Sequence, residues 1–457
     1  MTTAVPHRVH FVGVGGSGLS ALARVTMGLG SRVTGSDRVR GDEISSLQAL
    51  GLTFQVGHEP DLVKDAEMVV ITSAIREEVP EVAWARARGV TVCKRHQYLP
   101  LLAQGKRMVA IAGTHGKTTT TALLAHVLAE TDRDPTAVVG GMLESWGSNA
   151  RVGESDLFVV EADEYDRMFL SLNPWLGVLT IVEADHPDCY PDRAAMEAAF
   201  SQFARQCRSL VVNGDDPGIA RALAAAGVGS SSRYGRGVEC NWRLLAAAGD
   251  HDATTVSFRA PNGCSHRARV RMWGAHSAAN CLAAVAAAFE VGVPPAEASE
   301  ALSSFEGVRR RFSVRGPFSG VFVVDDYAHH PTEVWAVVDS ARQRFAGRRI
   351  LVVLQPHTFS RLEQHFEDFV EALRLGDEAF VLPVYASREA GDSVAAAALL
   401  ARAAGAVALP PVAEAAGPLL QHVRPGDVVL NLGAGDAQSL SSDLIAALAD
   451  GDVAPAS

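Results

Sequence analysis

Lysine is scarce in this chain of 457 residues. Only four lysines occur, Lys64, Lys94, Lys106 and Lys117, within a total of 41 lysines and arginines. Because arginine supplies nearly all the positive charge, a lysine at a position where a compact charge is needed is a candidate for a specific role. Acidic residues outnumber basic ones, and the formal net charge of -11 disfavours nonspecific nucleic-acid binding, which depends on cationic contacts to phosphate. We expect small-molecule partners and no nucleic acid.

Long hydrophobic runs and paired cysteines are also absent. No run of about 18 uncharged apolar residues is long enough to span a bilayer, and the N-terminus lacks the basic and apolar regions of a signal peptide. The sequence therefore predicts a cytoplasmic protein without membrane contact. The six cysteines form no CxxC pair, which argues against a zinc site and a disulfide framework and favours buried free thiols.

The length exceeds what one hydrophobic core usually serves, so two or three domains are expected. Strand-like and helix-like segments alternate from end to end, which predicts an α/β fold of parallel sheets with covering helices. We place the domains at residues 1–105, 106–314 and 315–457. The oligomeric state does not follow from the sequence. The main expected strands are 9–14, 32–35, 68–72, 108–112, 157–161, 176–183, 210–212, 321–325, 350–354, 379–382 and 428–432.

The most informative segment is MVAIAGTHGKTTTT at 108–121. An apolar strand enters a glycine turn, and a helix is expected from Thr118 onward. Backbone N–H groups and the positive end of the helix dipole would meet there on a phosphate. Lys117 would reach the terminal phosphates of a nucleoside triphosphate, and the Thr118 hydroxyl would coordinate Mg2+. The strict P-loop pattern is not met, because Ile111 and Ala112 stand five and four positions before Gly116, and the pattern needs a glycine at the first of these.

A second glycine loop, GVGGSG at 13–18, follows the first expected strand, and Asp37 ends the next one. By itself this pattern fits NAD as well as a UDP-linked ligand, because it specifies only a diphosphate at a helix N-terminus and a polar group near a nucleoside. A dehydrogenase, however, has no use for the second phosphate loop that follows about a hundred residues later.

Carboxylates follow two strands of the middle block. The sequence Glu161-Ala-Asp-Glu ends one, and Glu183-Ala-Asp-His186 ends the next. Such groups line the ligand crevice of an open parallel sheet, and oxygen ligands completed by a neutral imidazole suit Mg2+. Each acid alone could simply cap a helix; two such strands beside a phosphate loop favour a metal site.

Two features lie near the start of the third block. In Asp325-Asp326-Tyr-Ala-His329-His330-Pro the adjacent histidines point in different directions, so we expect contact with substrate or nucleotide across a cleft in preference to shared metal ligation. The run Arg309 to Arg311 is either a solvated basic face or, at a domain junction near an ATP site, a phosphate contact.

Taken together, these segments resemble the Mur ligases of peptidoglycan synthesis. The resemblance covers nearly the whole chain and rests on ordered motifs, among them HFVGVGGSGLS, AGTHGKTTTT, VVEADEYD, EADHPDCY, GAHSAAN, FEGVRRRF, VDDYAHHPTEV and LQPHTFSR. It implies a Rossmann-like first domain that binds a UDP-sugar, a central P-loop ATPase domain with a parallel sheet, and a Rossmann-like third domain that closes over both.

The resemblance also implies an activity, the ATP-dependent ligation of L-alanine to the lactyl carboxylate of UDP-N-acetylmuramate through an acyl phosphate, with ATP and two Mg2+ ions as cofactors. The implied catalytic residues are Lys117, Glu161, His186, Arg311, Asp326 and His329. The implied ATP contacts are Gly113, Thr114, His115, Gly116, Lys117, Thr118, Thr119, His276, Asn280, Arg311 and Asp326. The implied UDP-sugar contacts are Gly15, Gly16, Ser17, Gly18, Asp37, Ser73, His115 and Asn149. The implied metal ligands are Thr118, Glu161 and His186.

The chain departs from the family pattern at two positions. Ser277 stands where the family usually has asparagine and shortens one nucleotide contact, and Ile181 replaces an asparagine near the substrate. Both affect affinity more than the reaction. The alternatives are a recycling ligase that adds a whole tripeptide to the same sugar, an NAD-dependent oxidoreductase, and a catalytically silent UDP-sugar sensor, which the intact Lys117 and Glu161 disfavour.

Overall fold

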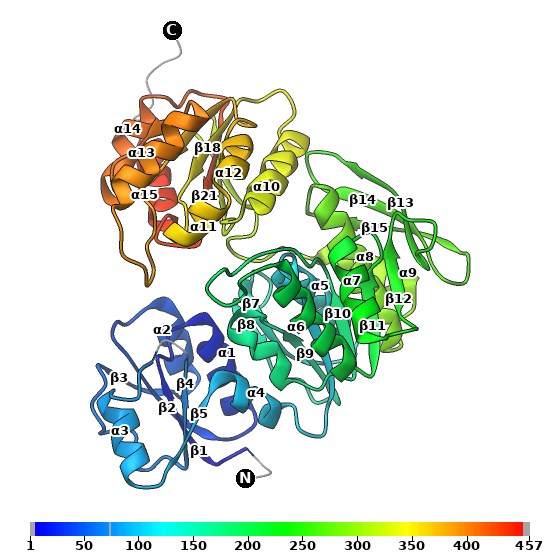
Figure 1. The fold of residues 1–457 in the computed structure, drawn as a ribbon, viewed down its shortest axis with the longest axis vertical. Coiled ribbons are helices and arrows are strands. Elements are labelled where there is room, and N and C mark those ends of the chain that lie inside the picture. Colours follow the sequence, from blue (N-terminus) through cyan, green and yellow to red (C-terminus); the bar gives the residue numbers. More distant parts are fainter. Residues whose placement is uncertain (1–4, 73–74, 451–457) are drawn as a thin grey trace.

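Three sheets organise the chain in the computed structural model, which describes residues 5–72 and 75–450. In Figure 1 the first domain lies at the lower left, the central domain in the middle and on the right, and the third domain at the top. None of the helices within the described ranges is long and apolar enough to cross a membrane.

The first domain has a five-stranded sheet in the order β3-β2-β1-β4-β5, in which all neighbouring strands are parallel. Its strands are β1 (Arg8–Val12), β2 (Arg32–Asp37), β3 (Thr53–Val56), β4 (Met68–Ile71) and β5 (Thr91–Lys94). Its helices are α1 (Ser17–Gly28), α2 (Asp42–Ala49), α3 (Pro80–Ala87) and α4 (Arg95–Leu102).

The central domain has a ten-stranded sheet in the order β15-β14-β13-β12-β11-β10-β6-β9-β7-β8. Its strands are β6 (Arg107–Ala112), β7 (Thr136–Leu143), β8 (Ser148–Arg151), β9 (Leu157–Glu161), β10 (Leu176–Leu179), β11 (Ser209–Asn213), β12 (Ser232–Gly235), β13 (Trp242–Gly249), β14 (Thr254–Arg259) and β15 (Ser265–Val270). Its helices are α5 (Lys117–Glu130), α6 (Arg193–Gln206), α7 (Pro217–Ala226), α8 (Ala275–Glu290) and α9 (Pro295–Ala301), with short 3-10 segments at Tyr165–Ser171 and Leu302–Ser304.

The third domain has a six-stranded sheet in the order β16-β17-β21-β18-β19-β20. Its strands are β16 (Ser313–Phe318), β17 (Val321–Asp326), β18 (Ile350–Leu354), β19 (Glu378–Val381), β20 (Val407–Ala408) and β21 (Val428–Leu432). Its helices are α10 (Pro331–Arg344), α11 (Phe359–Gln364), α12 (Phe366–Leu373), α13 (Ser393–Ala404), α14 (Val412–Leu420) and α15 (Gln438–Asp450).

The prediction of three α/β domains is confirmed, and the central sheet is where the detail differs. The strands from β12 through β7 pair in parallel as expected. At the ends, β8 runs antiparallel to β7, and β13, β14 and β15 form antiparallel pairs. The sheet is therefore mixed. In the third domain β16 likewise pairs antiparallel with β17.

Helix α5 is buried on nearly every side, because it lies between the central sheet and α8. Ten of its residues from Thr118 to Leu128 are buried, and α8 is built largely of alanine, which lets the two helix backbones approach closely. The packing fixes the N-terminus of α5 at the carboxyl end of β6. The phosphate loop expected there consequently has a rigid base.

The first domain packs on the central domain through α1, which contacts β7 and β8. A single cluster of buried apolar side chains runs from the first domain into one face of the central sheet. Gly28 at the end of α1 shows how close the approach is, because a Cβ there would lie 2.6 Å from Cγ2 of Val152. The carboxyl edges of the first two sheets are held in one arrangement by this contact.

Candidate active site

The loop between β6 and α5 needs glycine at two positions. Gly113 has φ +148° and Gly116 has φ +80°, conformations that side-chain-bearing residues rarely adopt. A Cβ on Gly113 would also collide with Oγ1 of Thr180, and one on Gly116 would lie 2.7 Å from Oδ1 of Asn280. The loop is therefore tightly enclosed, as expected for a backbone that wraps a phosphate.

Lys117 begins α5 and folds back over this loop. Its Nζ donates to the carbonyls of Gly113 at 2.6 Å and Thr114 at 3.1 Å, and to Oε1 of Glu164 at 2.8 Å. Burial lowers the pKa of Lys117, but the carboxylates of Glu164, Asp163 and Glu161 outweigh it and raise the pKa overall. The ammonium group is thus charged and held at the mouth of the loop.

Thr118 and Glu161 form the second part of the cluster. The Thr118 hydroxyl donates to Oε1 of Glu161 at 3.1 Å, and the Gly140 N–H donates to Oε2 at 2.8 Å. Burial raises the pKa of Glu161, and the charge of Lys117 opposes that rise. Two residues predicted as metal ligands therefore lie in contact, at the carboxyl end of β9.

His186 joins the same cluster through Glu164, with its Nε2 3.2 Å from Oε1 of the glutamate. Burial lowers the pKa of His186, while Glu164 and Asp185 raise it by more. Oε2 of Glu164 is buried and has no hydrogen-bond partner. Glu164 is thus the side chain that links Lys117 to His186, a role that the sequence reasoning did not assign to it.

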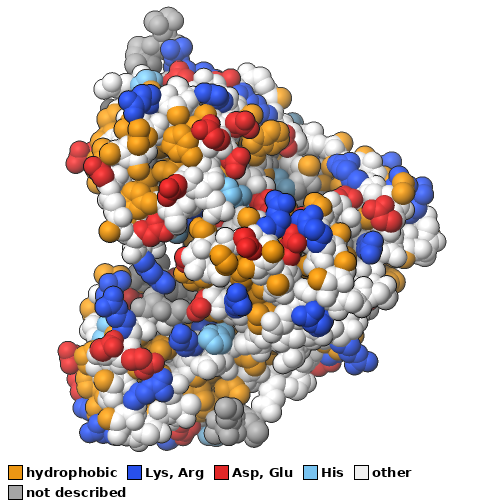
Figure 2. Space-filling model, viewed as in Figure 1, with side chains coloured by type: hydrophobic (Ala, Val, Ile, Leu, Met, Phe, Trp, Pro, Cys, Tyr) orange, Lys and Arg blue, Asp and Glu red, His pale blue; other side chains and the backbone are white. Residues whose placement is uncertain are grey.

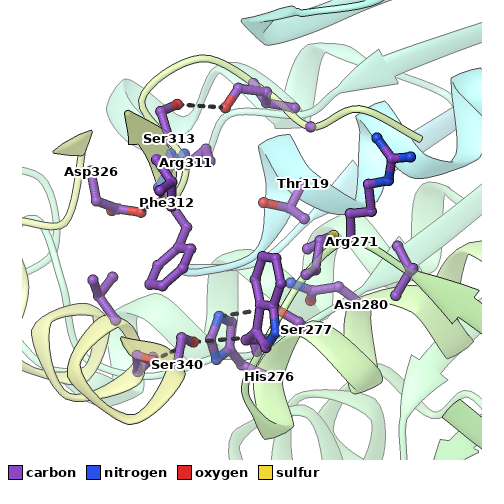
Figure 3. Close-up of a pocket in the computed structure, with 18 of the residues that line it drawn as sticks. Thr119, Arg271, His276, Ser277, Asn280, Arg311, Phe312, Ser313, Asp326 and Ser340 are labelled. Carbon is purple, nitrogen blue, oxygen red and sulfur yellow. Dashed lines mark hydrogen bonds between the residues drawn. The ribbon is translucent and has the colours of Figure 1, made fainter. Parts of the chain in front are cut away.

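A cavity of about 1070 Å³ opens beside this cluster, between the central and third domains. Figure 3 shows Thr119, Asn280, Ser277 and His276 on one side of it and Arg311, Phe312 and Asp326 on the other. The predicted nucleotide contacts that line it are His115, Gly116, Thr118, Thr119, His276, Asn280, Arg311 and Asp326. Residues separated by more than two hundred positions meet there.

Burial shifts the pKa of two of the cavity residues, Asp326 and His276. Burial raises the pKa of Asp326 to about 6, with Arg311 acting against it. Oδ1 of Asp326 accepts from the Ala328 N–H and Oδ2 from the Phe312 N–H, both at 2.7 Å. Burial lowers the pKa of His276 to about 4, so its ring is neutral at pH 7. Ser277 places its hydroxyl 3.2 Å from Nε2 of that ring.

The three arginines of the charge run separate in the structure. Arg309 pairs with Glu144 on the surface, and Nη2 of Arg310 donates to the Gly433 carbonyl at 2.6 Å. Only Arg311 lines the cavity, with its Nη1 3.9 Å from Oε1 of Glu333. Arg309 therefore fits the interpretation as a solvated basic face, and Arg311 is the member of the run that could contact a phosphate.

His115 is clamped between two domains. Its Nε2 donates to Oε1 of Glu183 in the central domain, and its Nδ1 donates to Oε1 of Glu333 in the third domain at 3.2 Å. Burial alone would lower the pKa of His115, but the two carboxylates raise it to about 10. The imidazolium therefore bridges the domains at neutral pH, an ion pair that motif reading did not foresee.

The ring of His330 lies against His115, with centroids 4.8 Å apart, and its Nδ1 is 3.5 Å from Glu183. These three side chains come close enough to one another to suggest a metal site. His115 donates from both ring nitrogens, and Nδ1 of His330 accepts the Thr332 N–H that caps α10, whereas Nε2 of His330 is buried without a hydrogen-bond partner. The group is better described as a hydrogen-bonded contact between domains.

His329, which the resemblance places near the reacting groups, has other partners than His330, and its role near those groups stays a prediction. Its Nδ1 lies 3.0 Å from the Tyr327 carbonyl and 3.3 Å from Oε2 of Glu333. Burial lowers its pKa to about 4, and its ring lies edge to face with that of His357 at 5.6 Å. The expectation that the two adjacent histidines diverge is thus confirmed.

A buried ion pair also joins the second and third domains. Nη2 of Arg361 donates to Oδ1 of Asp185 at 2.7 Å, and both side chains are 5% exposed or less. Burial would raise the pKa of Asp185, but His186 and Arg361 hold it well below its usual range. This pair lies next to His186, the predicted metal ligand, and no local sequence signal links α11 to that strand end.

The second glycine loop leads into α1 at the carboxyl edge of the first sheet. The Gly15 N–H donates to Oδ2 of Asp37 at 2.9 Å, so the two predicted UDP-sugar contacts touch. A Cβ on Gly18 would lie 2.6 Å from Nη1 of Arg95, whose guanidinium is 3.8 Å from Oδ2 of Asp163 in the central domain. Arg95 therefore lies between this glycine loop and the carboxylate of Asp163 that follows β9, and motif reading missed it.

Asn149 ties the central domain to the same loop. Its Nδ2 donates to the Ser17 carbonyl at 2.7 Å and to Oγ of Ser20 at 3.1 Å, while its Oδ1 is buried without a partner. Its predicted contact with the UDP-sugar stays a prediction. Ser73, another predicted contact, lies outside the described residues. The surface is hollowed on the side where the first and third domains face one another (Figure 2).

Three family models match the chain in order. The Mur ligase family, catalytic domain matches residues 8–107, the Mur ligase middle domain 111–288, and the Mur ligase, glutamate ligase domain 310–435. UDP-N-acetylmuramate–L-alanine ligases of Anaeromyxobacter dehalogenans and Myxococcus xanthus are each 39% identical over 96% of this chain, and the matches cover 98% and 94% of those proteins.

Solved structures agree in fold. The UDP-N-acetylmuramate-alanine ligase MurC from Thermotoga maritima superposes with a TM-score of 0.81 and 28% identity, covering 96% of this chain and 98% of that one. A murein peptide ligase from Psychrobacter arcticus gives a TM-score of 0.74 at 24% identity, over 97% and 99% of the two chains. At 24% identity, the second match supports the fold of this chain and not its activity.

The His115 clamp predicts a pH-dependent stability. Because folding raises the pKa of His115 from 6.5 to about 10, its contribution is fully present below pH 6.5, shrinks as the pH rises and is lost above 10. His115→Gln should lower the free energy of unfolding by on the order of 1–3 kcal/mol at pH 6. Urea unfolding at several pH values measures this. His251→Gln, at a side chain that is 81% exposed, is the matched control; a His115→Gln deficit that is constant from pH 6 to 10 would contradict the clamp.

Proposed function

The chain belongs to the Mur ligase family, and we propose how its residues carry out the reaction named for its relatives, the joining of L-alanine to UDP-N-acetylmuramate. The activity is that of an ATP-dependent UDP-N-acetylmuramate–L-alanine ligase of peptidoglycan synthesis. The observation that carries the assignment to these residues is the meeting of Lys117, Glu161 and His186 beside one cavity that two domains enclose.

The proposed chemistry has two steps. A lactyl carboxylate oxygen of the UDP-sugar attacks the γ-phosphorus of ATP, and the bond from that phosphorus to the β,γ-bridging oxygen breaks. ADP is the leaving group, and the UDP-sugar becomes an acyl phosphate. The amine of L-alanine then attacks the acyl carbon, loses a proton and displaces inorganic phosphate. The first step brings a carboxylate to a triphosphate, and the second expels inorganic phosphate, so both need cations placed beside the phosphoryl group. Water must also be kept from the acyl phosphate, because it would hydrolyse it.

We assign the residues as follows. Lys117 neutralises the transferring phosphoryl group, for which its charged, folded-back position prepares it. Arg311 approaches the same cavity from the hinge side, and Asp326 contacts the nucleotide beside it. His276 and Asn280, at the start of α8, take the adenosine side. These assignments rest on the shared cavity and on the family motifs.

The donors around Glu161 suit Mg2+. The Thr118 hydroxyl contacts Glu161, and the imidazole of His186 contacts Glu164, whose Oε2 is buried without a hydrogen-bond partner. Oxygen donors of this kind are the ligands that Mg2+ prefers. Bound Mg2+ would shield charge on the phosphates. Holding it requires a neutral His186 ring, so the contact of His186 with Glu164 must loosen when the ion binds.

The first domain is proposed to bind the UDP-sugar at Gly15 to Gly18 and Asp37, with its lactyl end directed toward the central cluster. A reaction that consumes ATP and a soluble nucleotide sugar places the enzyme in the cytoplasm. The tripeptide-adding ligase stays the alternative within the family, and near-full-length relatives at 39% identity favour alanine.

Phosphate release should require ATP, Mg2+, UDP-N-acetylmuramate and L-alanine together. A coupled phosphate assay in which each component is omitted in turn measures this, with NADH in place of the UDP-sugar as a negative control. Comparable turnover without the sugar, or a clear preference for tripeptide over alanine, would overturn the assignment.

Lys117→Ala should lower kcat by about a hundredfold or more, since a charge-assisted contact to a transferring phosphoryl group contributes on the order of 3 kcal/mol. UDP-sugar binding, measured by calorimetry, should be nearly unchanged, because Lys117 lies in another domain. Lys106→Ala, at a lysine that donates to Ser155 away from the cluster, is the matched control. Loss of UDP-sugar binding together with activity would make Lys117 structural.

Activity should be indifferent to bicarbonate. Some sister ligases bridge a second metal with a carbon dioxide-modified lysine after the D-H motif, and no lysine follows Lys117 in this chain. A second Mg2+ would therefore use His186, Glu161, substrate oxygens and water. Rates of degassed enzyme with and without bicarbonate, at fixed pH and ionic strength, test this, and a reproducible several-fold activation would refute it.

A further inference from the structure

In the first domain, a carboxylate is buried near the carboxyl edge of the sheet without a lysine or arginine partner. Glu81, in the first turn of α3, is 0% exposed. Its Oε2 accepts from Nε2 of His10 and from the Ser36 hydroxyl at 2.9 Å, and its Oε1 accepts from Nδ1 of His58 at 2.8 Å. Buried carboxylates cost stability unless such donors satisfy them, and here β1, β2 and the loop after β3 each contribute a donor to the one carboxylate.

The contact with Glu81 determines which ring nitrogen of His58 donates a hydrogen bond and which accepts one. An ionised carboxylate only accepts, so Nδ1 of His58 carries the proton. In the neutral ring Nε2 is then a hydrogen-bond acceptor. No partner for Nε2 occurs among residues 5–72 and 75–450, and the side chain is 18% exposed. His58 therefore offers a lone pair of fixed orientation to the surroundings.

His58 lies at the carboxyl edge of the first sheet, beside the glycine loop. It follows β3, and its Nδ1 is 3.3 Å from Oγ of Ser36 at the end of β2. The carbonyl of Ser36 accepts the N–H groups of Gly13 at 2.8 Å and Val14 at 3.1 Å. One residue thus touches both the loop expected to hold a diphosphate and the histidine. A nucleotide whose diphosphate lies at Gly15 to Gly18 would have its base within reach of this edge.

We infer that His58, oriented by Glu81, selects the nucleotide base by accepting a hydrogen bond from N3–H of uracil. Cytosine carries a lone pair at N3 and would place acceptor against acceptor. This inference rests on the proposed UDP-sugar site in the first domain and adds to it the residue that distinguishes uracil from cytosine. His58 contacts the base, and Glu81 is a positioning residue.

Calorimetric titration of the full chain with UDP and with CDP tests the inference. The wild-type chain should bind UDP at least about tenfold more tightly than CDP, because a site that supplies a hydrogen-bond acceptor rejects the analogue without the donor. His58→Leu should remove most of this preference while leaving the KM for ATP unchanged. An undiminished preference in His58→Leu would overturn the inference.

Glu81→Gln provides a sharper test. The amide has one acceptor oxygen for three donors and can donate to Nδ1 of His58, which moves the proton to Nε2 and offers a donor to N3 of cytosine. The ratio of the CDP to UDP dissociation constants should fall at least about fivefold, and the KM for UDP-N-acetylmuramate should rise with kcat retained. If Glu81 only supported the fold, both nucleotides would weaken alike, and that result would contradict the positioning role.

Glu77→Gln is the matched control, since Glu77 lies just before α3 and pairs with Arg86 on the surface. It should leave the nucleotide preference at the wild-type value. Failure of the proposed function is distinguishable, because it would appear as a wild-type chain with no phosphate release from UDP-N-acetylmuramate, ATP and L-alanine. Should Glu81→Gln fail to fold, His58→Leu and His58→Gln, changed at a partly exposed side chain, decide the question.

Discussion

The buried ion pair of Lys117 and Glu164 is the constraint on which the rest of the site depends. Two charges removed from water are stable only when further hydrogen bonds satisfy them. Lys117 donates to the loop carbonyls, and Oε1 of Glu164 has Nε2 of His186 as a second partner at 3.2 Å. The phosphate loop, the end of β9 and the strand-end histidine are thereby held together before any nucleotide arrives. In the proposed reaction an incoming phosphate would compete with Glu164 for the ammonium group, and the displaced carboxylate would already lie beside the donors proposed to take Mg2+.

Around this pair, the domains meet through polar contacts more than through apolar ones on the side of the third domain. His115 bridges Glu183 and Glu333, and Arg361 binds Asp185. The first domain differs, because its core continues into the central one through α1. A polar interface separates and reforms with less exposure of apolar surface than a continuous core does. The third domain is therefore the part suited to move during a reaction cycle in which an amino acid must enter and water must stay out.

Local patterns were sufficient to predict the features that depend on neighbours in sequence. The phosphate loop followed from an apolar strand, two glycines and Lys117, and the three-domain α/β fold from alternating segments. Glu164 could not be chosen, because Glu161, Asp163 and Glu164 are the same kind of group within four residues. Which of them faces Lys117 depends on a 3-10 segment with positive φ at Asp166 and Arg167. The antiparallel strands β13 to β15 were also missed, since the alanines of β13 give no alternating pattern, and the Arg361–Asp185 pair joins residues 176 positions apart.

Arg95 has a consequence for how the two nucleotide sites communicate. Its guanidinium lies against Gly18 of the first domain and 3.8 Å from Asp163, two residues from Glu161 in the central domain. A diphosphate at the glycine loop would draw this cation toward itself and leave Asp163 less neutralised, which alters the field around the triphosphate and its metal. Thermodynamic linkage makes such an effect reciprocal: whatever factor the first ligand applies to the affinity for the second, the second applies to the first. A single arginine would thus couple the affinities of the two proposed sites through shared charge, without any need for the domains to change shape.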